Sequence, residues 1–343
     1  MVTEVTSKRK GKLTRVIALE EHFSTPALMQ MNRKLFEPLT KFHGAHPSVA
    51  SYDELAGKLT DLGEGRISNM DHAGIDMQVL SLTSPGTDQM EPADALNFAS
   101  SSNDLVAGAV ERFPSRLAAF ASLPTSSPEK AADELERTVK QFGFKGAVIN
   151  GHCRGRYLDD RFFWPIFERA ESLGVPVYLH PTIPPPPIVN TYYAGKFEAD
   201  LTYRLSSAAW GWHIETATHV LRIILGGVFD EYPKLQLIIG HLGEALPFMM
   251  ERLEQNLPAA LTNLKHPFGA YLRENINYTI SGFNFTPVFL NLFLEVGAER
   301  IMFSADYPYS SMEEARDFLE HMPVSSDDRE RIAHGNAERL MHI

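Results

Sequence analysis

The chain has 343 residues, of which 44% are hydrophobic and 22% charged, a composition typical of a globular protein that buries a sizeable core. Its formal net charge of −11 argues against a nucleic-acid surface, and no apolar segment is long enough to span a bilayer. The single cysteine, Cys153, excludes an internal disulfide and fits a reducing compartment, so we expect a cytoplasmic protein.

Apolar, β-branched runs alternate with amphipathic stretches along the chain. Eight strands are predicted, at Val16–Glu20, Gln78–Thr83, Leu117–Leu123, Ala147–Asn150, Pro176–His180, Leu235–His241, Ile276–Ser281 and Ile301–Asp306. The clearest helices are predicted at Asp94–Arg112, Ala131–Phe142, Arg161–Leu173 and Val288–Val296. Eight buried strands alternating with helices indicate a parallel α/β fold, and the count favours a closed (β/α)₈ barrel (a TIM barrel). No glycine-rich phosphate loop follows the first strand, which weakens the alternative of an open dinucleotide-binding sheet.

The chain is predicted to be one domain, because no proline- or serine-rich linker divides it. Residues 1–14 contain a basic stretch without the apolar region of a secretory signal, and we expect a disordered tail followed by a barrel over residues 15–343. Two loop insertions are expected, at Phe36–Asp53 after strand 1 and at Pro181–Phe197 after strand 5. Barrel enzymes place substrate-covering loops at such strand ends.

Metal-ligand and acid–base residues stand at the carboxyl ends of four predicted strands. Glu20 and His22 share one face of strand 1, because side chains alternate along a strand; His180, His241 and Asp306 end strands 5, 6 and 8. Taken singly, each has an ordinary explanation, as a core histidine, a helix cap or a turn cap. The carboxyl ends of barrel strands meet on one face, however, so the set predicts a mixed nitrogen and oxygen site for Zn²⁺ or Mn²⁺. The metal ligands would be Glu20, His22, His180 and Asp306, with His241 beside the metal and oriented by Glu244.

Four segments that carry these residues resemble the amidohydrolase superfamily, and more narrowly its nonoxidative aromatic decarboxylases, such as the γ-resorcylate, 2,3-dihydroxybenzoate and 5-carboxyvanillate decarboxylases. The segments are Val16–Phe23, Tyr178–Pro181, Ile238–Glu244 and Phe303–Pro308. The resemblance implies one metal held by the same four ligands, with His241 catalytic. Many hydrolytic relatives have a carboxylated lysine on strand 4 that bridges two metals. Here strand 4 ends at Asn150 and Lys145 lies before that strand, so a binuclear site is not expected.

The resemblance implies a carboxy-lyase that releases CO₂ from an ortho-hydroxybenzoate after protonation of the ring. Asp306 is the expected proton donor, and His241, held by Glu244, is expected to polarise the substrate carboxylate. Three further residues are candidates for substrate binding: Arg252 for an anionic group, unless it is simply a solvated helix arginine, and Phe23 and Tyr309 as aromatic walls.

We also expect a homodimer or homotetramer, because the residue corresponding to Tyr309 lies near a neighbouring subunit in related decarboxylases. The resemblance to the 5-carboxyvanillate enzymes implies that these hold the second carboxylate with an arginine before a Leu-Gly-Glu segment. The corresponding segment here is Leu62–Glu64, Ser51 stands at the arginine position, and no arginine occurs between Leu35 and Glu64. A monocarboxylic substrate, such as a resorcylate, salicylate or orsellinate-like acid, is therefore expected.

Two alternatives stay open at this point. A metal-dependent hydrolase of a lactone or amide would use the same ligands to activate water, with Asp306 as the general base. A noncatalytic binding protein on a decayed barrel would be expected to lack one of the ligands, and none is missing.

Overall fold

The computed structural model describes residues 13–33 and 51–343. Residues 1–12 of the predicted tail, and residues 36–50 of the insertion predicted after strand 1, lie outside the described residues. No helix in the described ranges is long and apolar enough to cross a membrane.

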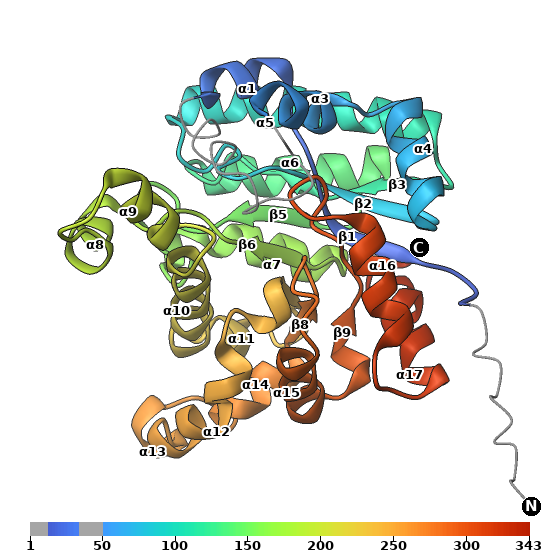
Figure 1. Ribbon diagram of the computed structural model, residues 1–343. Coiled ribbons are helices and arrows are strands. Elements are labelled where there is room, and N and C mark those ends of the chain that lie inside the picture. Colours follow the sequence, from blue (N-terminus) through green and yellow to red (C-terminus); the bar gives the residue numbers. More distant parts are fainter. Residues whose placement is uncertain (1–12, 34–50) are drawn as a thin grey trace, which may run out of the picture.

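Parallel strands form the centre of the molecule (Figure 1). They are β1 (Ile17–Phe23), β2 (Met77–Leu82), β3 (Leu117–Ala119), β4 (Ala121–Ser122), β5 (Ala147–Asn150), β6 (Val177–His180), β7 (Leu237–Ile239), β8 (Ile276–Thr279) and β9 (Ile301–Met302). One sheet has the order β1-β2-β3 and the other runs from β4 to β9 in sequence order. The single strand predicted at Leu117–Leu123 is divided at Phe120, whose N–H donates to the carbonyl of Leu80 (2.9 Å). The first and last strands also meet, because Leu19 of β1 forms a parallel bridge with Ser304, two residues after the end of β9.

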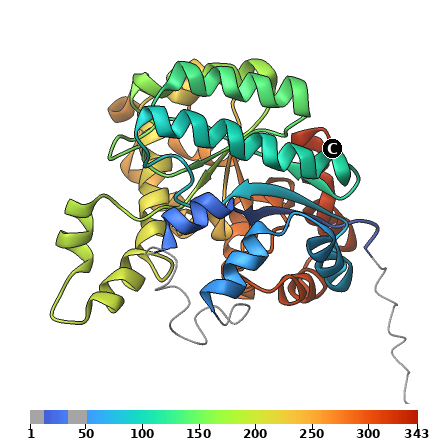
Figure 2. The same cartoon turned by 90° about the horizontal axis from the view of Figure 1, so that it is seen from above.

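Helices lie outside the strands, as expected for a parallel sheet covered on both faces (Figure 1). In chain order they are α1 (Pro26–Met31), α3 (Tyr52–Thr60), α4 (Glu64–Ala73), α5 (Pro92–Arg112), α6 (Pro128–Phe142), α7 (Trp164–Leu173), α8 (Pro186–Ile188), α9 (Ala199–Ser206), α10 (Gly211–Leu225), α11 (Val228–Glu231), α12 (Leu246–Asn256), α13 (Ala259–Thr262), α14 (Phe268–Glu274), α15 (Thr286–Val296), α16 (Met312–His321), α17 (Ser326–Glu330) and α18 (Asn336–Met341). Prolines occupy the first turns of α6 and α15, where the missing N–H costs no hydrogen bond. The segment with α8 and α9 projects away from the other helices (Figure 2).

The apolar core has an inner and an outer layer, which lie on opposite faces of the strands because alternate strand residues belong to different layers. The inner layer comprises Ile17, Leu19, Met77, Val79, Ala118, Phe120, Val148, Tyr178, Ile238, Met302, Ala337 and Met341. Ala337 and Met341 come from α18, which packs against these interior side chains. The outer layer includes Ala18 and Phe23 of β1 and the buried faces of the surrounding helices. Side chains at the carboxyl ends of the strands that point to the same face as the inner layer therefore lie next to packed apolar side chains.

Candidate active site

An irregularity in β1 directs Glu20 and His22 toward the interior. Ala18 pairs with Gln78 and Glu21 pairs with Leu80, so three residue steps on β1 lie opposite two on β2. Glu20 has a φ of 61°, in the left-handed region. Regular alternation after the inward-facing Leu19 would have turned Glu20 toward the helices. The predicted shared face of Glu20 and His22 is present, but the bulge determines which face it is.

Glu20 is buried, and its two carboxylate oxygens have different surroundings. Oε2 accepts hydrogen bonds from the hydroxyls of Tyr178, Thr279 (3.2 Å) and Ser281. Oε1 has no hydrogen-bond partner among the described residues. Burial raises the pKa of Glu20, while the charge of nearby His241 opposes that shift. None of the three hydroxyl partners was predicted from the sequence, although Thr279 at the end of β8 and Ser281 two residues later stand at alternating positions that share one face.

His180 presents an unprotonated nitrogen to the bare oxygen of Glu20. Its Nδ1 lies 2.8 Å from the carbonyl of Pro181, which can only accept, so Nδ1 carries the proton. Nε2 lies 3.3 Å from Glu20 Oε1. Burial, with the nearby charge of His22, holds the pKa of His180 well below its usual value. Two lone pairs at this distance repel each other, and a cation between them would remove the repulsion.

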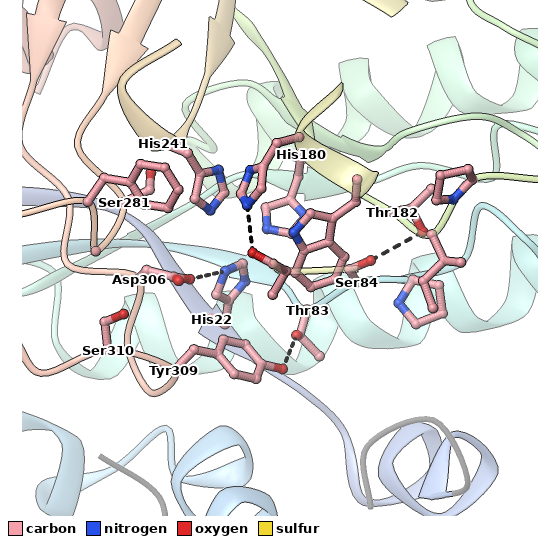
Figure 3. Close-up of a pocket in the computed structure, with 18 of the residues that line it drawn as sticks. His22, Thr83, Ser84, His180, Thr182, His241, Ser281, Asp306, Tyr309 and Ser310 are labelled. Carbon is pink, nitrogen blue, oxygen red and sulfur yellow. Dashed lines mark hydrogen bonds and ion pairs between the residues drawn. The ribbon is translucent and has the colours of Figure 1, made fainter. Parts of the chain in front are cut away.

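Asp306 follows β9 and lies beside His22 (Figure 3). Its Oδ1 is 3.0 Å from His22 Nε2, and its own φ is 64°. Glu21, which points away from Glu20 and His22, accepts hydrogen bonds from the backbone amides on both sides of Asp306. Ala305 N–H donates to Glu21 Oε1 (2.8 Å) and Tyr307 N–H donates to Glu21 Oε2 (3.4 Å). Thus Glu21 fixes the turn that presents Asp306.

His241 and Glu244 lie together, as predicted, and a second histidine completes the group. His241 Nδ1 is 2.7 Å from Glu244 Oε1, and His213 Nδ1 is 2.6 Å from Glu244 Oε2. Burial alone would lower the pKa of His241, but the charges of Glu244 and Glu20 raise it to about 10. For Glu244 the signs are reversed: burial alone would raise its pKa, but the two histidines lower it. Nothing in the sequence marked His213, in the first turn of α10, as a site residue.

These side chains line or adjoin a cavity of about 460 Å³ (Figure 3). The lining residues are His22, Thr83, Ser84, Pro85, Gln89, His152, His180, Thr182, Ile183, Pro184, Pro186, Tyr203, Ala208, Trp212, His213, His241, Ser281, Gly282, Phe283, Phe285, Asp306, Tyr309 and Ser310. Tyr309 is a wall, as predicted, with its hydroxyl 2.6 Å from the hydroxyl of Thr83. The prediction that Phe23 forms an aromatic wall is wrong. Phe23 is next to His22 on β1, so its side chain points to the opposite face and packs in the outer layer of the core. Arg252 is exposed on α12 and is not among the residues that line this cavity.

The residues at the strand ends fit one divalent cation. One nitrogen or carboxylate oxygen from each of Glu20, His22 and His180 lies within 4.8 Å of the others, and Asp306 adjoins them through His22. Asn150, at the end of strand β5, donates through its backbone N–H and its side-chain amide to Asp88 Oδ2 (2.9 and 3.2 Å). The side chain of Asn150 is therefore an amide engaged with Asp88, and it offers no carboxylate at that position.

The chain is similar to known decarboxylases over nearly its whole length. A family model described as amidohydrolase matches residues 43–343. A γ-resorcylate decarboxylase of Polaromonas sp. (strain JS666) is 36% identical over 95% of this chain and 98% of the relative. The decarboxylase orsB of Emericella nidulans is 32% identical over 96% of this chain and 97% of the relative. A crystal structure of a dihydroxybenzoic acid decarboxylase from Polaromonas, with manganese and the inhibitor 2-nitroresorcinol, superimposes with a TM-score of 0.85 at 35% identity, covering 96% of this chain and 97% of the other.

Proposed function

The chain belongs to the amidohydrolase family, and from this premise we propose that it is a metal-dependent nonoxidative decarboxylase of a monocarboxylic ortho-hydroxybenzoate. The observation that carries the proposal is the buried carboxylate of Glu20, one oxygen of which has no hydrogen-bond partner among the described residues. That oxygen faces the ring nitrogen of His180, which lines a cavity with aromatic walls. The full-length similarity to decarboxylases of hydroxybenzoates supports the same reaction. We propose γ-resorcylate, salicylate or an orsellinate-like acid as the substrate.

The charge of the cavity supports a monocarboxylic acid. Neither lysine nor arginine occurs among the described residues that line it. A second carboxylate on the substrate would then be buried without a bidentate partner, which lowers affinity strongly. The aromatic and proline side chains of the lining would pack against the faces and edges of one ring.

Glu20, His22, His180 and Asp306 would hold the metal ion, for which Mn²⁺ and Zn²⁺ are the candidates. When bound, the ion supplies positive charge that orients the acid and stabilises negative charge on its oxygens. The side chains of the cavity would carry out the remaining steps, which are proton transfer and orientation of the substrate carboxylate.

Asp306 would deliver a proton to the ring carbon that bears the carboxylate, aided by electron density from the ortho oxygen. The bond between that carbon and the carboxylate then breaks, its electron pair restores aromaticity, and CO₂ leaves. His241, with Nδ1 donating to Glu244, would turn Nε2 toward the substrate carboxylate. Solvent would return the proton to Asp306 after the product leaves.

The test is a panel of acids scored for CO₂ release by metal-loaded protein. Salicylate, γ-resorcylate and orsellinate represent the proposed class, and 5-carboxyvanillate represents dicarboxylic acids. We expect CO₂ from at least one monocarboxylic acid, with a higher kcat/KM than for 5-carboxyvanillate. A preference for 5-carboxyvanillate would overturn the substrate class, and turnover of lactones or amides alone would favour the hydrolase.

Metal stoichiometry tests the ligand assignment separately. We expect one equivalent per chain in the wild type and a large loss in His180→Ala, because His180 Nε2 is a proposed ligand. Two equivalents in the wild type, or undiminished metal in the variant, would contradict the assignment.

We further propose that the two sheets close into one (β/α)₈ barrel spanning residues 15–343. The contacts of Phe120 with Leu80 and of Leu19 with Ser304 support this arrangement, because they join the sheets at both sides. We also propose a homodimer or homotetramer, and a role for Arg252 would then require a neighbouring subunit, since Arg252 does not line the cavity of its own chain.

A further inference from the structure

We infer that His213 is a positioning residue that, through Glu244, orients His241 toward the cavity. This inference rests on the proposed function for its kinetic consequences, but its structural content does not. It follows from the contacts of three buried side chains.

Both nitrogens of His213 face acceptors. Nε2 lies 3.0 Å from the carbonyl oxygen of Ala208. Nδ1 lies 2.6 Å from Glu244 Oε2. His213 thus links the Glu244 carboxylate to the backbone of Ala208, just before the start of α10.

Glu244 divides its two oxygens between the two histidines. Oε2 is held by His213, and Oε1 lies 2.7 Å from His241 Nδ1. A carboxylate fixed at one oxygen holds the other in place, so the ring of His241 is oriented by a group that cannot turn. With Nδ1 committed to Glu244, Nε2 of His241 is the nitrogen left for the cavity, and it lies 3.9 Å from Glu20 Oε1.

The surrounding packing holds the two rings together. Their centroids are 4.6 Å apart with an interplanar angle of 70°, and Phe283 lies 5.2 Å from each ring. The start of α10 is fixed as well: a side chain on Gly211 would meet the backbone of Ser206 at 2.4 Å, so only glycine allows this approach. His213 comes two residues later and reaches back to Ala208 in the turn before the helix.

The backbone carrying His241 and Glu244 needs such support. Five successive residues, 241 to 245, have positive φ (51°, 54°, 92°, 53° and 66°), and only Gly243 among them lacks a side chain. A left-handed run of this kind persists only where contacts from elsewhere impose it. The bond from His213 to Glu244 ties this turn to α10.

A second metal ion held by His213, His241 and Glu244 is the competing explanation, since their ligand atoms lie within 4.8 Å of one another. Both oxygens of Glu244, both nitrogens of His213 and Nδ1 of His241 already have hydrogen-bond partners. Glu20 differs, because its Oε1 has no partner among the described residues. The hydrogen bonds therefore account for the His213 group without an ion.

Two substitutions of His213 separate its contacts. Asparagine places an amide N–H near the position of Nδ1 and keeps a donor for Glu244, whereas glutamine reaches toward Ala208 and loses it. We expect His213→Gln to lower kcat at least about tenfold with KM within about threefold, and His213→Asn to retain most of kcat. Metal content should stay at the wild-type value in both. Equal losses in the two variants, or loss of metal, would overturn the inference.

A double-mutant cycle tests whether His213 acts through Glu244. In a Glu244→Ala background, His213→Gln should cause little further loss, because no side-chain oxygen is left for His213 to hold. Full additivity of the two losses would contradict a positioning role.

The contact between His213 and Glu244 is measured without turnover. In wild-type protein with ¹⁵N-labelled histidine, Nδ1 of His213 should show the shift of a hydrogen-bonded N–H, with the signal assigned by its loss in His213→Asn. An Nδ1 without a proton would overturn the inference. If no acid on the panel is decarboxylated, the proposed function fails while this measurement still stands.

Discussion

Individual residues at the candidate site adopt backbone conformations that L-amino acids rarely take. Ten non-glycine residues in the described ranges have positive φ, and seven of them lie at the ends of strands around the cavity: Glu20, His241, Leu242, Glu244, Ala245, Ser281 and Asp306. Each such residue costs on the order of 1–2 kcal/mol of folding free energy. Stability is therefore given up where Glu20, His241 and Asp306 must point inward, and the buried hydrogen bonds to these turns offset the cost.

The first prediction concerns His241. His241→Asn should keep its metal, because His241 is not among the proposed ligands, and should lose at least about 10²-fold in kcat, the scale of a missing acid–base or electrostatic partner. Metal analysis and steady-state kinetics on the same preparation measure both. Turnover within a few-fold of wild type would remove His241 from the mechanism.

The second prediction concerns His219, a buried histidine outside the cavity. Its Nε2 accepts a hydrogen bond from the backbone N–H of Leu158 (2.8 Å), and burial lowers its pKa to about 3. Between pH 6.5 and 3 the unfolded chain binds a proton at this position and the folded chain does not. Stability therefore falls on acidification, by up to about 1.4 kcal/mol per pH unit from this group.

Replacement of His219 tests this sign. His219→Gln keeps an acceptor for Leu158 and removes the titration, so its free energy of unfolding should decline less steeply from pH 6.5 to 4.5 than that of the wild type. Urea unfolding across this range gives both slopes, and the substitution Thr218→Ser, at an exposed neighbour, should leave the slope unchanged. Parallel slopes for wild type and His219→Gln would refute the assignment.

At the scale of the strands and their loops, Gly240 shows how closely β7 approaches β1. A Cβ on Gly240 would lie 2.7 Å from Glu20 Oε2 and 2.9 Å from Ser281 Oγ. Its φ is −85°, so an alanine would be excluded by space and not by backbone conformation.

The third prediction follows from that contact. Gly240→Ala should displace the Glu20 carboxylate and weaken metal binding at least about tenfold, the scale of a disturbed ligand environment. Gly108→Ala is the matched control: it lies in α5 with nothing within 4 Å of the added methyl group, so metal binding should not change and stability should rise by up to about 1 kcal/mol. Metal titration and thermal unfolding distinguish the two, and unchanged affinity in Gly240→Ala would show that Glu20 is not a ligand.

Across the whole molecule, large apolar side chains remain exposed on α12, α13 and α15. Phe248 is 80% exposed, Leu261 67% and Leu294 81%. Large apolar side chains this exposed are found on surfaces that meet a partner. In Figure 1 these helices lie on the side of the molecule opposite α5.

The fourth prediction is therefore an oligomer that these helices help to form. Light scattering should give two or four times the chain mass of 38.4 kDa. Phe248→Glu should lower that mass or weaken association, whereas Leu105→Glu, on the exposed face of α5, should not. A mass near that of one chain in the wild type would exclude the oligomer.

The sequence by itself determined the parallel α/β fold, seven of the eight strands as single elements, and the residues at the strand ends. Local patterns suffice for this, because apolar periodicity marks buried strands and parallel strands bring their carboxyl ends to one face. The strand predicted at Leu117–Leu123 is divided at Phe120, and β9 is shorter than predicted, because after Met302 only Ser304 forms a bridge, with Leu19.

Tertiary structure alone decided how the side chains at these strand ends are oriented and what holds them. The bulge in β1 turns Glu20 inward and Phe23 outward, and aromatic walls come instead from residues such as Phe283. His213 reaches Glu244 from a helix 31 positions earlier in the chain, and Tyr178 reaches Glu20 across 158 positions. Side-chain alternation is a local property that a single extra residue reverses, and contacts between distant segments depend on how the strands and helices pack together.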